Sequence, residues 1–352
     1  MRDAGRIAGV VGAMAVSSVA TVFYAPRLSR VLSDFYGNVW WPGHRILHGA
    51  AGFPDTHSAW PPPATATFVP LAFLPEWAAV FLWVAGSVAA FGWALWLVGC
   101  RDWRACAVGL ASPPVLCCLV LGNMTLLLVA GVAAVWVCRD RRPVLAGSAL
   151  GAMILLKLWL WPVVVFLLLT RRLRAALSSA VWVAVGTIVW WLVSRDTLYR
   201  YHAVTTRAVE GFAQLGMGIV SIVVNDGGSL RTAQALAFVA GVGVLAIAWR
   251  ASADLTRFTL CLAAALVASP IVWTHYYAIL FVPIALRSPR LSGVWLVPYI
   301  TIGALLWPTI RLEFIVASTA CLAAVAIVCI HVARPNATRE ARQRALPIPA
   351  GH

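Results

Sequence analysis

An aspartate stands at position 34, near the start of the segment SDFYGNVWWPGHRILHG, which covers residues 33–49. A carboxylate acts as a general base toward a hydroxyl when it lies within about 3 Å of the proton that it takes. We expect the segment to lie along a membrane surface, because it contains aromatic residues typical of membrane interfaces, namely Phe35, Tyr36, Trp40 and Trp41. A structural alternative stays open, since Ser and Asp are both good helix N-cap residues.

Lys157 is the only lysine of the chain, and it interrupts the apolar stretch GAMILLKLWLWP. An ionisable side chain at membrane depth usually faces a cavity or a partner, so this cation is a candidate for neutralising a phosphate. The alternative is that its long side chain reaches out to the membrane interface.

Asn123, His275 and Tyr276 are polar residues at breaks in apolar runs. Asn123 follows a glycine, and its amide either hydrogen-bonds a sugar or caps the following helix. His275 follows the stretch SPIVWT and precedes two tyrosines. A lone histidine is more often structural than catalytic, but a proline break with several polar groups at membrane depth favours a site.

Three further residues, Arg45, His57 and Trp60, are candidates for binding an acceptor or shaping its loop. Trp60 begins the run WPPP. Proline lacks the amide hydrogen and restricts the residue before it, so we expect a rigid, extended approach to the next apolar segment. A rigid end to the loop, with no role in binding, is the structural alternative.

The elements that position these residues are predicted to be membrane helices. Apolar residues make up 62% of the chain, charged residues 11%, and the mean hydropathy is +0.86, values typical of membrane proteins rather than soluble domains. Continuous apolar runs favour helices over the alternating strands of a barrel. We therefore expect an all-α polytopic protein in contact with membrane lipids.

The net charge of +15 comes largely from arginines in small groups between the apolar runs. This is the pattern of cytoplasmic loops rather than of a nucleic-acid-binding face, so we expect no nucleic-acid partner. Neither a pair of acidic residues nor a His/Cys spacing typical of a metal site is apparent, and we expect no metal and no cofactor.

The arginine clusters also predict the topology, because clusters on one face are separated by an even number of crossings. Placing them all in the cytoplasm gives about twelve transmembrane or partly spanning helices with both termini cytoplasmic. Single crossings are expected at 6–24, 75–98, 174–194 and 232–249, and hairpins at 105–138, 144–170, 258–286 and 291–333. Residues 1–334 then form one membrane domain, followed by a disordered cytoplasmic tail at 335–352.

The hairpin tips are expected on the outer face. Each arm of the hairpin at 144–170 has about 13 residues, or about 20 Å of helix, against a hydrocarbon core of about 30 Å. Non-helical backbone at membrane depth is tolerated only inside protein or beside a wet cavity. We therefore expect Asn123, Lys157 and His275 to border an outward-facing cavity, with long loops at 25–74 and 195–231 on the same side.

Taken in order, these motifs resemble those of glycosyltransferase family 87, the polyprenyl-phosphate-sugar-dependent mannosyltransferases and arabinofuranosyltransferase of actinobacterial envelope synthesis. The resemblance runs from about Asp34 to His275. It rests on Asp34-Phe35 with Val39-Trp40 and Leu47-x-Gly49, Trp60-Pro61-Pro62, Gly122-Asn123, Ala146-Gly147 through Lys157 to Arg171-Arg172, and Ser269-Pro270-Ile271-x-Trp273-x-His275-Tyr276. Pro42-Gly43 departs from the pattern, because it interrupts the short helix expected after the aspartate.

The resemblance implies a C-type glycosyltransferase fold that transfers a sugar, foremost mannose, from a polyprenyl phosphate to an envelope glycolipid or glycan. The reaction would take place on the outer face of the cytoplasmic membrane. Asp34 would be the general base, and Lys157, His275, Tyr276 and Asn123 would bind the donor phosphate and sugar. The alternatives are an arabinofuranosyltransferase using decaprenyl-phosphate arabinose, a lipid-linked sugar flippase or transporter, and a noncatalytic assembly subunit.

Overall fold

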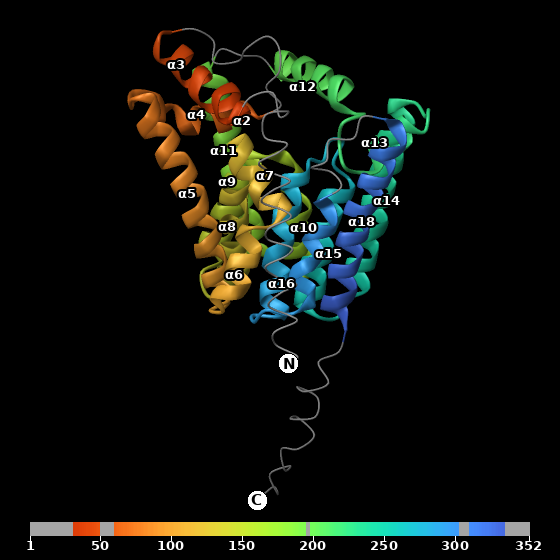
Figure 1. Ribbon diagram of the computed structural model, residues 1–352. Helices are drawn as coiled ribbons and strands as arrows, with labels where there is room; N and C mark the ends of the chain where they lie inside the picture. The colour runs from red at the N-terminus through yellow and green to blue at the C-terminus, as the bar shows by residue number, and fades with distance from the viewer. Residues whose placement is uncertain (1–30, 50–59, 195–197, 303–309, 335–352) are drawn as a thin grey trace, which may run out of the picture.

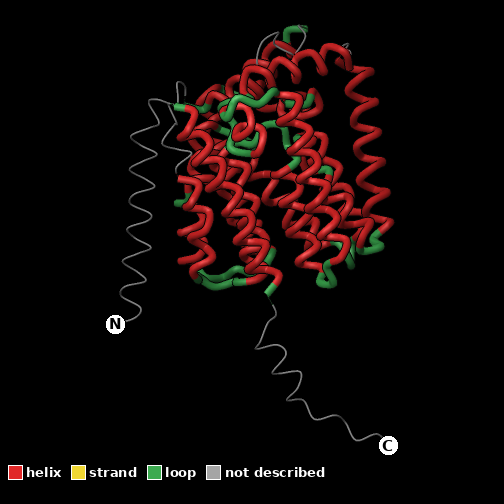
Figure 2. The backbone as a smooth tube through the Cα atoms, turned by 90° about the vertical axis from the view of Figure 1, so that its right-hand side faces the viewer, coloured by secondary structure: helices red, strands yellow, loops and turns green. Residues whose placement is uncertain are grey.

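The computed structural model describes residues 31–49, 60–194, 198–302 and 310–334, which form a bundle of helices (Figure 1). Figure 2 shows the same helices, joined by short loops, after a quarter turn. The predicted first crossing at 6–24, the candidate His57 and the predicted tail at 335–352 lie outside the described residues.

Four described helices are long and apolar enough to cross a bilayer, which takes about 20 residues. They are α5 (Glu76–Leu97), α11 (Leu173–Ser194), α14 (Leu230–Arg250) and α18 (Arg311–Ala333). A fifth span is present if the pair α6 (Trp103–Leu110) and α7 (Pro113–Leu121), bent by 57°, is counted as one. The helices predicted at 75–98, 174–194 and 232–249 are thereby confirmed.

Shorter helices occupy the regions where hairpins were predicted: α8 (Thr125–Cys138), α9 (Pro143–Leu156), η3 (Leu158–Leu160), α10 (Pro162–Leu169), α15 (Asp254–Val267), η4 (Thr274–Leu280), α16 (Phe281–Arg287) and η5 (Gly293–Thr301). A helix of 14 residues, such as α9, is about 21 Å long and falls short of a hydrocarbon core of about 30 Å. The chain leaves the helix at Lys157, which is extended, with φ −150° and ψ 105°. This break is buried inside the protein, as backbone at membrane depth requires.

Ion pairs and a hydrogen bond join segments at the arginine-bearing end of the bundle. Arg172 bonds Asp140 at 2.8 Å and Asp254 at 2.6 Å, linking the turns before α9 and α11 to the first residue of α15. The amide of Leu291 donates to the carboxylate of Asp102 at 3.0 Å. These residues belong to the arginine-bearing turns that the positive-inside rule assigns to the cytoplasm.

Short helices cover the opposite end of the bundle. They are α2 (Ser33–Phe35), η1 (Tyr36–Trp40), α3 (Trp41–Leu47), α4 (Pro62–Phe68), η2 (Val69–Phe73), α12 (Leu198–Phe212) and α13 (Ile219–Asn225); Figure 1 shows α2, α3, α4 and α12 at its upper end. The described parts of the segments predicted as long loops at 25–74 and 195–231 are therefore largely helical, and none of these helices is a candidate span. α12 has an amphipathic sequence, typical of a helix that lies at a membrane surface.

Pro42 does not interrupt the helical run after the aspartate, contrary to the prediction. α2, η1 and α3 follow one another without a gap, and η1 is a π-helical turn. Pro42 lies in the first turn of α3 and cannot donate to the carbonyl of Asn38, four residues earlier. The Thr65 hydroxyl donates to that carbonyl instead, at 3.4 Å. The π-helical turn and this hydrogen bond from α4 compensate for the backbone hydrogen bond that the proline cannot donate.

The WPPP run is extended only at its start. Pro61 has ψ 143°, as predicted, but α4 already begins at Pro62. A proline in the first helical position loses no hydrogen bond, because the amides of the first turn have no partner within the helix.

Candidate functional site

Asp34 is held by a side-chain amide from another helix connection. Asn123 donates from Nδ2 to Oδ2 of Asp34 at 2.5 Å. Thr125 fixes the orientation of the Asn123 amide by donating to Oδ1 from its backbone nitrogen at 3.0 Å and its hydroxyl at 2.7 Å. α2 has no side-chain capping bond, and its N-cap residue is Leu32, so Asp34 is not the helix cap of the structural alternative. Asn123 both bonds the first residue of α8 and presents its amide to the aspartate.

Gly122 lets the turn between α7 and α8 approach α2. Its φ is +65°, in the left-handed region that favours glycine. The amide of the next residue donates to the carbonyl of Cys118 at 2.8 Å, the closing bond of a Schellman motif. The indole of Trp83 donates to the Gly122 carbonyl at 2.8 Å, and Phe35 packs on that indole with ring centroids 5.6 Å apart. This packing fixes the residue next to Asp34.

The aromatic residues around Asp34 divide between the protein and its surface. Phe35 and Trp40 are buried in the core, whereas Trp41 is 61% exposed. The expectation that all these rings lie along a membrane surface is therefore wrong for the first two. Phe35 stacks on Trp40 and packs against Trp83 of α5, which anchors α2 and η1 to the bundle, and Asp34 itself is partly buried.

We expect Gly122→Ala to destabilise the protein more than Gly99→Ala. Both glycines have positive φ, which costs an alanine about 1–2 kcal/mol. A Cβ on Gly122 would also meet the Cβ of Phe35 at 2.7 Å, whereas a Cβ on Gly99 meets nothing within 4 Å. Overpacking adds roughly 1–3 kcal/mol at Gly122 alone. Unfolding of both variants by titration with denaturing detergent measures the difference, and equal losses would contradict this account.

The Lys157 ammonium is buried among aromatic rings. The residue is 5% exposed, so the alternative that its side chain reaches out to the membrane interface is wrong. Its Nζ donates to the Tyr276 hydroxyl at 3.0 Å and lies 5.3 Å from the ring centroid of Trp60. Trp159 stacks on the Tyr276 ring with centroids 5.0 Å apart. No carboxylate of the described residues lies within 4 Å of Nζ, so aromatic faces and one hydroxyl stabilise the charge without neutralising it.

His275 lies in the same neighbourhood, against α7. It is 1% exposed, and its Nδ1 lies 3.9 Å from the Cys117 thiol. Its Nε2 is buried and has no hydrogen-bond partner within the described structure. Lys157 interacts electrostatically with both Asp34 and His275, so these three predicted residues lie in one region. A buried ring nitrogen without a partner can bond a substrate.

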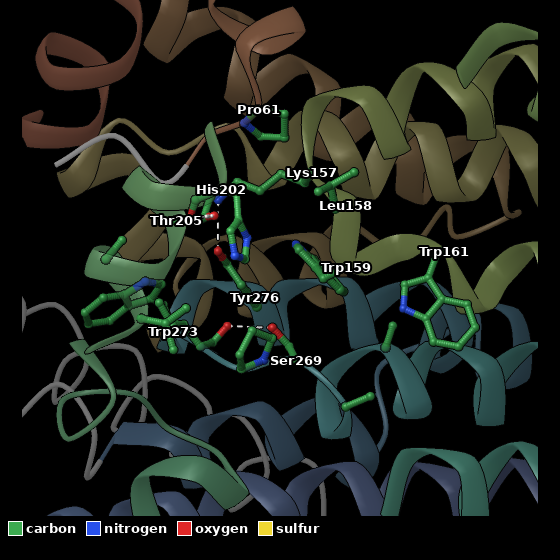
Figure 3. A pocket seen from close by; sticks show the side chains of 16 residues that line it. Pro61, Lys157, Leu158, Trp159, Trp161, His202, Thr205, Ser269, Trp273 and Tyr276 are labelled. Atoms are coloured by element: carbon green, nitrogen blue, oxygen red, sulfur yellow. Dashed lines mark hydrogen bonds between the residues drawn. The ribbon is translucent and has the colours of Figure 1, made fainter. Parts of the chain in front are cut away.

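A cavity of about 460 Å³ opens beside Lys157 (Figure 3). Tyr276 and Trp159 line it together with Lys157, and α12 contributes His202 and Thr205. Most of the other lining residues are apolar. Asp34, Asn123 and His275 do not line this cavity, so the expectation that Asn123 and His275 border it together with Lys157 is wrong for these two.

The loop candidates take different positions. Trp60 is 3% exposed and faces Lys157, rather than standing free in a loop. Arg45 is exposed on α3, and His57 is not among the described residues. His202 and Thr205 were not predicted from the sequence, although the amphipathic spacing of 198–212 indicates a surface helix there. Trp159 was not predicted either, because its stacking on Tyr276 joins segments 117 residues apart and has no local signal.

Asp34 lies outside the candidate spans, and its surroundings change its acidity. Burial raises the pKa of the Asp34 carboxyl above its ordinary value. The hydrogen bond from Asn123 and the charge of Lys157 favour the ionised form and offset part of this rise in pKa. Such a carboxylate is a stronger proton acceptor than an exposed aspartate, as a general base requires.

Comparison with known proteins identifies the family of the chain. The family model of glycosyltransferase family 87 matches residues 59–270, which is more than half of the chain. The matched range contains Asn123 and Lys157, whereas Asp34, His275 and Tyr276 lie outside it. No curated protein and no solved structure matches the chain. No group of three or more potential metal-binding side chains occurs among the described residues. The resemblance seen in the sequence is thus confirmed: the chain belongs to glycosyltransferase family 87 and is a membrane glycosyltransferase.

Proposed function

We propose that the chain transfers mannose from a polyprenyl phosphate to an envelope glycolipid or glycan, with inversion at the anomeric carbon. The observation that carries the proposal is the Lys157 ammonium, which is buried at the wall of a mainly apolar cavity and has no carboxylate within 4 Å in the described part. A lipid phosphate supplies both an anion for this cation and apolar chain for the cavity walls.

Asp34 accepts the proton of the attacking hydroxyl. The acceptor oxygen forms a bond to the anomeric carbon as the bond from that carbon to the phosphate oxygen breaks. The leaving polyprenyl phosphate takes the electron pair of the broken bond, and the proton moves to the Asp34 carboxylate. Asn123 holds the carboxylate at 2.5 Å, so the base is oriented before the substrate arrives.

Lys157 stabilises the negative charge that develops on the leaving phosphate. A cation inside a water-poor site is worth more than one in water, because the surrounding dielectric is lower. Tyr276 holds the ammonium through its hydroxyl at 3.0 Å, and His275 offers the unpartnered Nε2 to the same phosphate or sugar. The reaction proceeds by displacement from a lipid phosphate, with no cofactor in its scheme.

The orientation follows from the same proposal. The ends rich in arginine face the cytoplasm, both termini included, and the site with α12 faces outward. The chain crosses the cytoplasmic membrane in a C-type glycosyltransferase arrangement of about twelve transmembrane or partly spanning helices. A high ratio of arginine to lysine suits a high-GC genome such as that of an actinobacterium.

Purified full-length protein, reconstituted in vesicles with labelled polyprenyl-phosphate mannose and an envelope glycolipid extract, tests the proposal. We expect label to pass to the glycolipid as free polyprenyl phosphate appears. Turnover of decaprenyl-phosphate arabinose, without turnover of the mannose donor, would show that the transferred sugar is arabinofuranose. Movement of intact donor between leaflets without turnover would show a flippase instead, and neither activity would point to an assembly subunit.

We expect the pH dependence of transfer to report Asp34. Only the ionised carboxyl accepts a proton, so kcat/KM falls as the pH drops through its pKa. Burial raises this pKa, and the acid limb therefore lies above that of an exposed aspartate, whose pKa is about 3.9. Asn123→Ala removes a hydrogen bond that lowers the pKa, so the limb should move to higher pH. Profiles of kcat/KM for both proteins measure the shift, and a shift to lower pH would be inconsistent with this assignment.

A further inference from the structure

A second hollow lies at the arginine-bearing end of the bundle, away from Asp34 and Lys157. It is a groove of about 330 Å³ between η5 and α18. Its walls are aliphatic side chains of both elements, namely Val294, Val297, Ile327 and Ile330. The two isoleucines are 40% and 56% exposed on a helix long enough to span a bilayer, so this face of the groove meets lipid chains.

Basic side chains border one end of this groove. His331 and Arg334 line it, and the guanidinium of Arg287 donates to the backbone carbonyl of Arg334. Ser288 Oγ lies 3.0 Å from His331 Nε2 and ties the turn after α16 to α18. Neither Arg287 nor Arg334 forms an ion pair within the described ranges. Two arginines without an acidic partner thus stand where an aliphatic groove ends.

We propose that this groove binds an anionic phospholipid, with an acyl chain between η5 and α18 and the phosphate between Arg287 and Arg334. Basic pockets between membrane helices on the cytoplasmic side suit the phosphates of anionic lipids, and the aliphatic walls suit their chains. The charge pattern decides the occupant. A zwitterionic lipid such as phosphatidylcholine also carries a phosphate, but the two arginines repel its cationic head group, and they would repel a basic peptide as well.

The site is independent of the proposed transfer reaction. It shares no lining residue with the cavity beside Lys157, and a lipid bound there is not the donor. Its ligand is a structural or regulatory lipid of the inner leaflet, a membrane surface that carries negative charge.

The test uses full-length protein purified from vesicles of phosphatidylcholine, with and without phosphatidylglycerol. Native mass spectrometry counts the lipids retained by each chain, and tryptophan fluorescence follows thermal unfolding. We expect phosphatidylglycerol to be retained in preference to phosphatidylcholine and to raise the Tm. Replacing both arginines, by Arg287→Gln with Arg334→Gln, should weaken its retention by roughly 10- to 30-fold, since each basic residue near the surface contributes to binding.

Two further variants separate lipid binding from folding. Gly293→Leu leaves both arginines in place and extends a side chain into the groove, where a Cβ meets no atom within 4 Å; it should lower retention as well. Arg250→Gln removes an exposed arginine from the end of α14, outside the groove, and should leave retention unchanged.

Equal retention of the two lipids, or unchanged retention in both groove variants, would overturn the proposal. The proposal would also be overturned if inorganic phosphate, added to protein in phosphatidylcholine vesicles, raised the Tm as much as phosphatidylglycerol does. The site would then take a free anion. Because these measurements need no sugar donor, their outcome is independent of the transferase assay.

Discussion

Asp34→Asn is expected to lower kcat for sugar transfer by about 10²- to 10⁴-fold, the usual contribution of a general base. Asparagine has the shape of aspartate, and its Oδ1 can still accept the hydrogen bond that Asn123 donates at 2.5 Å. The neutral side chain cannot take the proton of the attacking hydroxyl. Release of polyprenyl phosphate from the labelled donor by reconstituted protein measures the loss.

The matched control is Glu76→Gln. Glu76 is an exposed carboxylate at the same end of the bundle, and it accepts the hydroxyl of Tyr36 from the helical run that carries Asp34. The Glu76→Gln variant therefore removes one negative charge beside the same segment and leaves the proposed base unchanged. We expect its transfer rate to stay within a few-fold of wild type. Full activity of Asp34→Asn, with donor binding and Tm unchanged, would rule out the base assignment.

The sequence predicts the fold well where the signal is local. Apolar runs and arginine clusters place α5, α11 and α14 within a few residues of their observed bounds, because both patterns depend only on neighbours along the chain. The same logic fails at residues 33–47, where Pro42 is expected to end a helix. A hydroxyl from α4 compensates there, and no pattern within the segment encodes a partner 27 residues away.

The residues of the site also divide into those that a local signal predicts and those that only tertiary packing reveals. Asp34, Asn123, Lys157 and His275 stand out in the sequence because polar residues are rare in apolar runs, and the structure gathers them in one region. The rings that surround Lys157 are less visible. In a chain with 18 tryptophans, only tertiary packing distinguishes Trp60 and Trp159 from those that face lipid. The family match supports the reaction class, whereas contacts between helices give each residue its setting.

Lys157→Met is expected to raise the KM for the donor and lower kcat, with the KM for the acceptor nearly unchanged. Methionine keeps an unbranched side chain of similar length and removes the charge. A hydrogen bond to a charged group contributes about 1.5–3 kcal/mol, so kcat/KM for the donor should fall by roughly 10- to 150-fold. Initial rates at varied donor and acceptor concentrations measure the two effects separately.

Stability distinguishes this role from a structural one. The Lys157 ammonium is 5% exposed and has no carboxylate within 4 Å among the described residues, so burying it costs free energy that an apolar side chain does not lose. Lys157→Met should therefore match or exceed the Tm of wild type while its activity falls. Tyr276→Phe, which removes only the hydroxyl that bonds Nζ at 3.0 Å, should lose activity less than Lys157→Met does. A lower Tm for Lys157→Met with unchanged donor kinetics would show that the lysine serves the fold rather than the donor phosphate.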